Sequence, residues 1–352
     1  MYRILIRPLL FLVSPETVHH WVVGILKFVC AVPGAANIIR RFTTVNDKRL
    51  KRELFGIQFA NPVGIAAGFD KNAQVFDELS HFGFGHIEVG TVTPKPQPGN
   101  PKPRLFRLTR DKALINRMGF NNHGLEAMAQ RLKQWRLNKS VAAATRPVIG
   151  GNIGKNTLTP NIEAVEDYVT NFRGLFEYVD YFVVNVSCPN ISNLKELQDQ
   201  DALMEILSRI QAINKSMPKP KPVLLKVSPD LNNKQLDEVI QIVRESGIDG
   251  VVATNTTITR NTLRNDRQRA SEIGQGGLSG QPLRDRSTEV IRYLAEKSGK
   301  AFPIIGVGGI MTPEDAIEKL KAGADLVQVY TGFIYSGPFL ARKINKMILK
   351  KL

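Results

Sequence analysis

The chain has 352 residues, of which 43% are hydrophobic, so it can bury one barrel-sized core or two smaller ones. Its two cysteines exclude a disulfide scaffold and favour a reducing cytoplasm. The net charge of +16 implies attraction to an anion, such as nucleic acid, a membrane surface or a phosphorylated or carboxylated ligand.

The first 42 residues are apolar but repeatedly interrupted, and no run reaches the ~20 apolar residues of a spanning helix. Ser14 as N-cap and Pro15 at the first helical position predict that a helix begins here. One apolar stripe at helical spacing is formed by Val18, Trp21, Val22, Ile25 and Val29. With its basic surroundings, this stripe favours docking on an anionic lipid surface. An ordinary helix packed on the main domain is the alternative.

From residue 62 onward, short apolar, β-rich runs alternate with helical ones. The runs are nearly continuous in apolar residues, as parallel strands buried on both faces require. The strands are predicted at 62–68, 86–93, 147–154, 180–187, 222–228, 249–255, 303–310 and 325–331, and helices at 166–179, 201–213, 233–246, 287–297 and 312–324. Eight such units favour a closed (β/α)8 TIM barrel over a doubly wound open sheet. We therefore expect a helical extension over 1–42 and a barrel over 43–352.

Polar residues follow the carboxyl ends of all eight predicted strands, which is where barrel enzymes carry out their chemistry. They are Gly68, Asp70, Lys71, Thr91, Asn152, Asn185, Cys188, Lys226, Thr254, Asn255, Thr256, Gly308, Gly309, Tyr330 and Thr331. Asn and Thr also cap helices and Gly makes turns, but capping alone does not explain so polar a set. The set contains no metal-ligand cluster, no Ser/His/Asp arrangement and no carboxylate pair suited to glycoside chemistry.

Two glycine-rich turns suggest a phosphate site. "GVGGI", 306–310, lets backbone N–H groups approach an anion, and "GGLSGQPL", 276–283, is a second such turn on the same side. Together they indicate a phosphorylated cofactor. Lys226 ends an apolar run and could stabilise negative charge near N1 of a flavin ring. Its alternative role is to pair with a carboxylate of the core.

Amide side chains are abundant at the same end and suit a ligand with amide-like edges, such as a cyclic imide or a pyrimidine. They are Asn116, Asn121, Asn185, Asn190 and Asn255. Lys71 could hold a carboxylate. Cys188, in a proline-containing loop after a strand, is a candidate general base, whereas a small buried hydrophobe is the commoner use of a free cysteine.

These segments resemble the dihydroorotate dehydrogenases, in family order across 50–352. The stretches that carry the resemblance include "AAGFDK" (66–71), "VGTVTP" (89–94), "INRMGFNN" (115–122), "VNVSCPN" (184–190), "GGLSGQPL" (276–283) and "IIGVGGI" (304–310). The extension resembles that of the class 2 members, which dock on the membrane and pass electrons to a quinone. Class 2 enzymes usually have serine where this chain has Cys188, and cysteine is similar to the soluble class 1 enzymes.

The resemblance implies FMN in the barrel and oxidation of dihydroorotate to orotate, with Cys188 removing the C5 proton while hydride moves from C6 to flavin N5. FMN would contact Ala67, Gly68, Lys71, Thr91, Asn152, Asn185, Lys226, Thr254, Gly280, Gly309, Tyr330 and Thr331. The substrate would contact Lys71, Asn116, Arg117, Met118, Gly119, Phe120, Asn185, Asn190, Asn255 and Thr256. Quinone would enter near His19, Arg107 and Tyr330.

The extension weighs more than a single substitution, so we expect a class 2 enzyme, peripheral on the cytoplasmic side of the inner membrane and without a nucleic-acid partner. Three alternatives remain. One is a flavin enzyme that reduces uridine in transfer RNA, which the positive charge would suit. The others are a non-catalytic, lipid-attached barrel and a soluble class 1 enzyme that uses fumarate or a nicotinamide cofactor.

Overall fold

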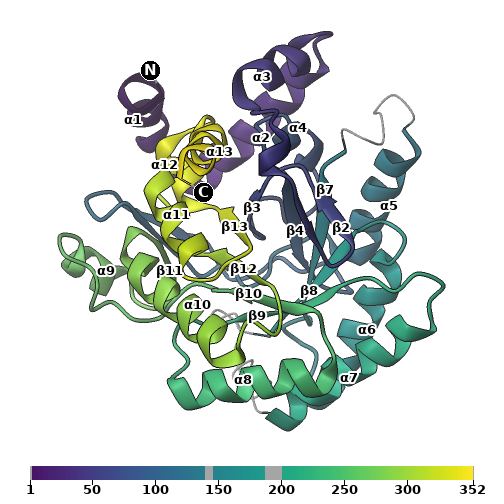
Figure 1. Cartoon of the computed structure of the whole chain (residues 1–352). Helices are drawn as coiled ribbons and strands as arrows, with labels where there is room; N and C mark the ends of the chain where they lie inside the picture. Colours follow the sequence, from purple (N-terminus) through teal and green to yellow (C-terminus); the bar gives the residue numbers. More distant parts are fainter. Residues whose placement is uncertain (1, 139–145, 187–199, 352) are drawn as a thin grey trace.

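The computed structural model describes residues 2–138, 146–186 and 200–351 (Figure 1). Two residues of the predicted site, Cys188 and Asn190, lie outside these ranges. Eight parallel strands close into a barrel in the order β3-β4-β7-β8-β9-β10-β12-β13, with β13 pairing back onto β3. The (β/α)8 barrel is thus confirmed, and the open-sheet alternative is wrong.

Each predicted strand range contains one strand of the barrel. The strands are β3 (Val63–Ile65), β4 (His86–Val92), β7 (Val148–Ile153), β8 (Tyr181–Asn185), β9 (Val223–Val227), β10 (Gly250–Ala253), β12 (Ile304–Val307) and β13 (Leu326–Val329). Every residue in them is buried. The apolar runs arise because the strands face the barrel interior on one side and helices on the other.

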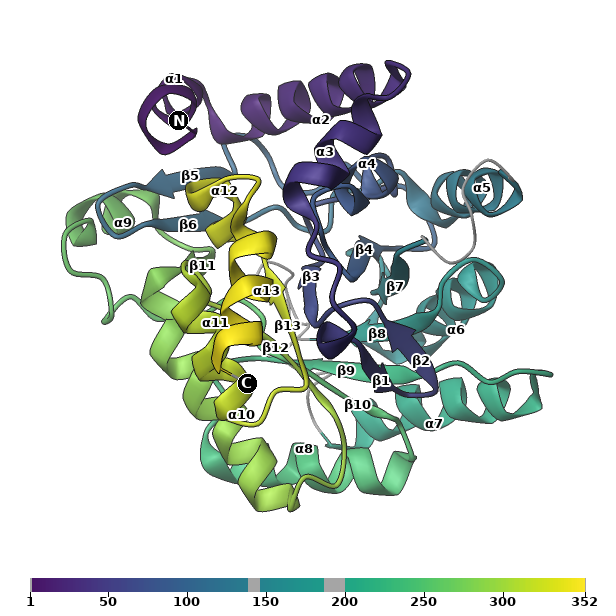
Figure 2. The ribbon, with the colours of Figure 1, turned by 45° about the horizontal axis from the view of Figure 1, so that its top comes forward.

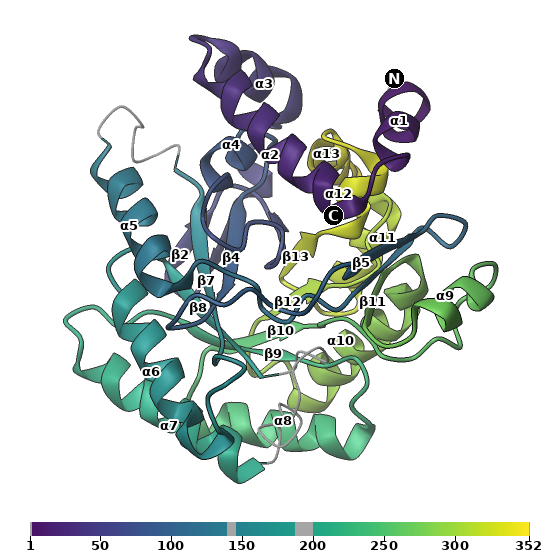
Figure 3. The ribbon, with the colours of Figure 1, turned by 180° about the vertical axis from the view of Figure 1, so that it is seen from behind.

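Helices surround the barrel, as Figure 3 shows from behind. They are α4 (Phe76–Ser80), α5 (Gly124–Leu137), α6 (Ala164–Leu175), α7 (Gln200–Ser216), α8 (Asn233–Ser246), α9 (Arg267–Ile273), α10 (Arg284–Ser298), α11 (Pro313–Lys321), α12 (Thr331–Ser336) and α13 (Leu340–Lys351), with short 3₁₀ turns at Lys48–Leu50, Asn161–Glu163 and Gln281–Leu283. All five predicted helices are confirmed. Capping boxes begin two of them, Asn232 with Gln235 at α8 and Thr312 with Asp315 at α11.

Two small antiparallel sheets that the sequence did not predict lie outside the barrel. The hairpin of β1 (Arg52–Leu54) and β2 (Ile57–Phe59) directly precedes β3, and its Phe59 packs edge-on against His86 at the amino end of β4, with ring centroids 5.6 Å apart. The other sheet contains β5 (Leu105–Leu108), β6 (Ala113–Asn116) and β11 (Gly277–Gly280). Its strands belong to the loops after β4 and β10, so it lies at the carboxyl end of the barrel.

The N-terminal helices lie at one end of the molecule, in purple in Figure 2. They are a π-helical turn (Tyr2–Ile6), α1 (Arg7–Phe11), α2 (Pro15–Ala31) and α3 (Ala35–Thr43). The predicted helix start is confirmed, because the Ser14 side chain accepts a hydrogen bond from the Thr17 N–H. The predicted boundary after residue 42 falls in the last turn of α3.

The apolar stripe predicted on α2 lies mostly on the exposed side of the helix, and only its first member is buried. Val18 is only 8% exposed, whereas Trp21 is 52% and Ile25 58% exposed. Val23 and Leu26 pack on the core in their place. The helix is apolar on both sides, so helical spacing alone does not show which side meets the barrel. Its outer face carries Trp21, Ile25, Phe28 and Val29.

Candidate active site

An open cavity occupies the carboxyl end of the barrel, with an empty volume of about 1130 Å³ including its mouth. It brings together most of the predicted site. Its lining includes Ala67, Gly68, Lys71, Thr91, Asn185, Lys226, Thr254, Gly280, Gly309, Tyr330 and Thr331 from the cofactor set, and Asn116, Met118, Gly119, Phe120, Asn255 and Thr256 from the substrate set. Residues that lie more than 250 positions apart in the chain therefore line one site.

Among the described residues, two of the predicted cofactor and substrate contacts do not line the cavity. Asn152 is fully buried behind its wall, where its side-chain oxygen accepts from the Thr91 hydroxyl and from the Asn185 amide. The Arg117 guanidinium stacks over Phe106 and donates to the Ile273 carbonyl, 2.8 Å away. Asn152 thus orients two groups of the wall, and Arg117 holds the small β5-β6-β11 sheet to the end of α9.

Other residues that line the cavity were not among the predicted site residues. They include Leu105, Leu114, Ser279, Leu283, Val307 and Gln328. The first three lie on the small sheet over the barrel mouth, which has no counterpart in the eight-strand pattern. Gln328 had a usable signal, because it is the single polar residue inside the apolar run of β13.

A buried charge pair lies at the cavity floor, where Lys226 lines the cavity and Glu88 lies beneath it. The Lys226 nitrogen lies 3.5 Å from a carboxylate oxygen of Glu88, and both side chains are almost inaccessible. Glu88 also accepts from the amide nitrogens of Asn152 and Gln328, each at 2.7 Å. Lys226 therefore pairs with a carboxylate of the core, the alternative considered for it, and it also lines the cavity, as the flavin role requires.

Amides and a second lysine form the wall. The Asn185 amide donates to the Thr91 hydroxyl at 3.0 Å, and Asn255 donates to the Asn185 oxygen at 3.3 Å. The Lys71 ammonium donates to the Asn121 side chain. These hydrogen bonds fix the directions of donors and acceptors that a planar ligand with amide edges can use.

Glycines bring the backbone up to the cavity on the β12 side. Gly309 has φ +72°, and a Cβ there would lie 2.2 Å from the Arg284 Cα. Gly280 has φ +96°, and a Cβ there would lie 2.4 Å from the Lys112 carbonyl oxygen. Only glycine fits both the backbone conformation and the space at these positions. A backbone that lines a cavity without side chains in the way is what an anionic phosphate requires.

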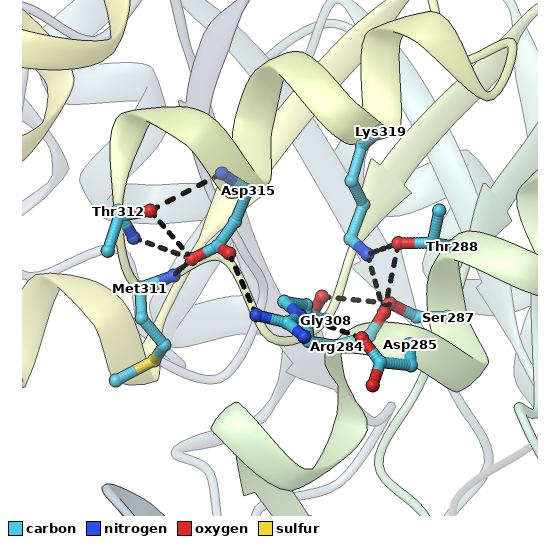
Figure 4. Close-up of polar contacts among 9 residues, drawn as sticks. All are labelled: Arg284, Asp285, Ser287, Thr288, Gly308, Met311, Thr312, Asp315 and Lys319. Carbon is cyan, nitrogen blue, oxygen red and sulfur yellow. Dashed lines mark hydrogen bonds and ion pairs between the residues drawn. The ribbon is translucent and has the colours of Figure 1, made fainter.

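Figure 4 shows how the turn around Gly308 is held from behind. Ser287 donates to the Gly308 carbonyl at 2.8 Å. The Asp315 carboxylate accepts from the N–H groups of Met311 and Thr312 at 2.9 and 2.8 Å. The fully buried Lys319 donates to the Arg284 carbonyl and to the Thr288 hydroxyl, and burial lowers its pKa to about 7. The glycine turn therefore rests on a rigid layer of α10 and α11.

An aromatic series leads from the cavity to α2. Tyr330 lines the cavity and donates to the Gly68 carbonyl, and burial raises its pKa to about 12. The Phe69 ring lies 5.6 Å from Tyr330 and 5.4 Å from His19, centroid to centroid. Arg107, the third predicted quinone residue, stacks 4.5 Å from the Phe11 ring and donates to the Val13 carbonyl. The three predicted quinone residues thus lie where the N-terminal helices meet the barrel.

His19 is held neutral at this boundary. Burial, and then the nearby Lys71 ammonium, lower the pKa of His19 to about 4. Because the folded pKa is below the ordinary value of 6.5, the unfolded chain binds more protons between these values. The stabilisation is therefore complete above pH 6.5 and is lost as pH falls toward 4.

We predict that wild type loses about 3 kcal/mol more unfolding free energy than His19→Asn between pH 7 and pH 4. Denaturant unfolding of both proteins at pH 7, 6, 5 and 4 measures the difference. The buried His81 and His86 are present in both proteins and cancel. Parallel pH profiles would mean that the ring stays accessible to protons in the folded state.

A closed barrel with a lysine floor, an amide wall and a glycine cradle at its carboxyl end defines a cofactor-dependent barrel oxidoreductase. The sequence model of the dihydroorotate dehydrogenase family matches residues 49–352. The chain belongs to this family.

The similar proteins cover nearly the whole chain. A relative from Christiangramia forsetii, named dihydroorotate dehydrogenase (quinone), is 58% identical and covers 100% of this chain and 99% of its own length. A relative of the same name from Gloeobacter violaceus is 48% identical and covers 100% of this chain and 95% of its own length. Crystal structures of Eimeria tenella DHODH, in complex with ferulenol and ligand-free, are both 35% identical over 96% of this chain. They cover 91% and 94% of those chains, with TM-scores of 0.82 and 0.86.

Proposed function

We propose that the protein oxidises dihydroorotate to orotate in pyrimidine biosynthesis, with FMN as its flavin and a membrane quinone as the final electron acceptor. The chain is an oxidoreductase of the quinone-dependent class 2 type. One observation carries the proposal: a single cavity joins a glycine cradle, a lysine floor and an aromatic series that ends at the N-terminal helices.

The residues present fit FMN. Gly280 and Gly309 line the cavity and carry no side chains, so their backbone is open to a phosphate. Lys226 brings positive charge to the floor, where the N1 edge of the ring would lie, and Thr254 and Thr91 add hydroxyls beside it. When bound, FMN supplies the hydride-accepting N5.

The rest of the cavity suits dihydroorotate. Lys71 offers an ammonium to the carboxylate, while Asn116 and Asn255 offer amides to the ring edges. The arrangement fixes the orientation of the substrate before any proton moves, which removes the entropy cost of alignment from the barrier. Cys188, which follows the last residue of β8 by three positions in the sequence, is the proposed base for the C5 proton.

The N-terminal helices suit a peripheral membrane contact. Exposed apolar side chains gather on α2 and α3, among them Trp21, Ile25, Phe28, Ile38 and Phe42. Within the described residues, no single helix is long and apolar enough to cross a bilayer; α2 and α3 reach that length only together, bent by 111°. A bent apolar pair with Arg40 and Arg41 beside it fits an anionic surface on the cytoplasmic side of the inner membrane.

The visible spectrum of the purified protein tests the cofactor and the substrate together. We expect a yellow protein whose flavin absorbance bleaches on anaerobic addition of dihydroorotate. A colourless protein that cannot be reconstituted with FMN would support the non-catalytic barrel. Tight, salt-sensitive RNA binding without bleaching would instead support the alternative of a flavin enzyme that reduces uridine in transfer RNA.

Removing residues 1–42 tests the path to quinone. We predict that dihydroorotate still bleaches the flavin of the truncated protein. Quinone turnover should be at least tenfold slower, because His19 and the side of α2 that packs on the barrel are removed. The measurement compares anaerobic flavin reduction with steady-state quinone turnover. Unchanged quinone turnover would place the acceptor site elsewhere.

A matched variant separates membrane contact from quinone binding. Trp21→Ser with Phe28→Ser changes only exposed positions of α2. This protein should keep wild-type turnover with a short-chain, water-soluble quinone and lose turnover with a long-chain quinone in anionic vesicles. Equal loss with both quinones would mean that the exposed face contributes to the quinone pocket itself.

A further inference from the structure

We propose that Glu88 is a positioning residue that sets how much of the Lys226 charge reaches the flavin ring, and that it thereby tunes the reduction potential of the bound flavin. The inference rests on the proposed function, because it requires a flavin across the cavity floor. Glu88 does not line the cavity, so it acts through the residues that do.

The geometry fixes the Glu88 carboxylate under the floor. Glu88 is 0% exposed in the middle of β4. One of its oxygens accepts from Asn152 of β7 at 2.7 Å and lies 3.5 Å from the Lys226 nitrogen of β9. The other accepts from Gln328 of β13 at 2.7 Å. All three partners present hydrogens or positive charge, so the pocket is built for a carboxylate anion.

Two of these partners connect Glu88 to the ligand. Lys226 and Gln328 both line the cavity, while Asn152 anchors the wall residues Thr91 and Asn185. A buried cation with an anion directly behind it presents a smaller field than the cation alone. In a protein interior, a unit charge a few ångströms away changes the equilibrium constant for forming a nearby anion by roughly tenfold or more. The pair therefore gives a weaker positive floor than Lys226 would give by itself.

The smaller positive field at the flavin ring affects how easily electrons leave it. Electrons must enter the flavin from dihydroorotate and leave it to a quinone, so too strong a pull on negative charge at N1 would slow the second half-reaction. Glu88 limits that pull without taking the ammonium away from the ring. Its carboxylate also fixes the Lys226 side chain in place, which a solvated counterion could not do.

Sulfite measures the field at the ring directly. It adds through its sulfur lone pair to N5 of the oxidised flavin, and the displaced electron pair leaves negative charge at the N1 edge. We expect Glu88→Gln, which is isosteric but neutral, to bind sulfite about tenfold more tightly than wild type. The same factor corresponds to a rise of about 30 mV in the two-electron midpoint potential. Both are read from the flavin spectrum, without turnover.

Glu88→Asp is the matched control, because it keeps the charge and moves it one methylene away from Lys226. Its sulfite affinity should rise by only about twofold to threefold. If Glu88→Gln does not retain its flavin, the rise in sulfite affinity of Glu88→Asp tests the proposal in its place. Sulfite affinity and midpoint potential equal to wild type in the flavin-loaded variants, with only lower thermal stability, would overturn the proposal and leave Glu88 a purely structural residue.

The outcome is distinguishable from a failure of the proposed function. A wild-type protein that binds no FMN would remove the function and the inference together. A yellow wild type that dihydroorotate bleaches, with no change in sulfite affinity at Glu88→Gln, would remove the inference alone.

Discussion

Cys188→Ala is expected to keep its FMN but to reduce it with dihydroorotate about 10² to 10⁴-fold more slowly than wild type. Alanine removes the only proposed acceptor for the C5 proton and leaves unchanged the cavity-lining residues proposed to contact the cofactor. Anaerobic stopped-flow bleaching measures the rate, and the flavin content of the purified protein shows that the site is intact. Full retention of the rate would remove the cysteine from the mechanism.

Cys188→Ser is the control for the chemistry of the base. A thiol is far more acidic than a hydroxyl, so wild type should maintain flavin reduction to lower pH than the serine variant. The comparison uses the pH profile of the reduction rate. Superimposable profiles would mean that the ionisation of this side chain does not limit proton abstraction.

Gly309→Ala is expected to weaken FMN binding by about tenfold to a hundredfold, because its methyl group would overpack the turn proposed to hold the FMN phosphate. The new Cβ would lie 2.2 Å from the Arg284 Cα and 2.4 Å from its nitrogen, so either α10 or the glycine turn must shift. The layer of Ser287, Asp315 and Lys319 behind the turn resists such a shift. Titration of the flavin-free protein with FMN measures the loss.

Gly274→Ala separates the clash from the backbone strain. Gly274 has φ +78°, close to the +72° of Gly309, but a Cβ there meets nothing within 4 Å. Both alanines carry the cost of a non-glycine residue at positive φ, on the order of 1–3 kcal/mol, and only one clashes. Gly274→Ala should therefore lose some stability and keep wild-type FMN affinity. Equal loss of FMN in both variants would attribute the effect to general destabilisation.

The barrel could be predicted because its signal is local. A strand buried on both faces must be apolar along its length, so all eight barrel strands fall inside the predicted ranges. The position of the polar residues followed from the same reasoning, since the carboxyl ends of parallel strands meet at one end of a closed barrel. Lys71, Lys226 and Asn255 therefore came together in one cavity as expected.

The face of a helix that meets the core was not predictable in the same way. The sequence of α2 is apolar on more than one side, so the spacing that places Trp21, Ile25 and Val29 in one stripe did not show that this stripe faces away from the barrel. The barrel decides which side is covered, and the barrel is a surface assembled from distant residues. Figure 2 shows these helices at one end of the molecule, where the remaining apolar side is left exposed.

The sequence by itself determined the eight barrel strands, five of the helices and the end of the barrel that carries the polar residues, because each depends on neighbours within a few positions. Only the tertiary structure decided that Asn152 lies behind the cavity wall, that Gln328 lines it and that Glu88 pairs with Lys226 beneath it. These contacts join residues from four strands of a closed barrel, and the direction of each side chain depends on strand register and barrel closure, which local sequence patterns do not specify.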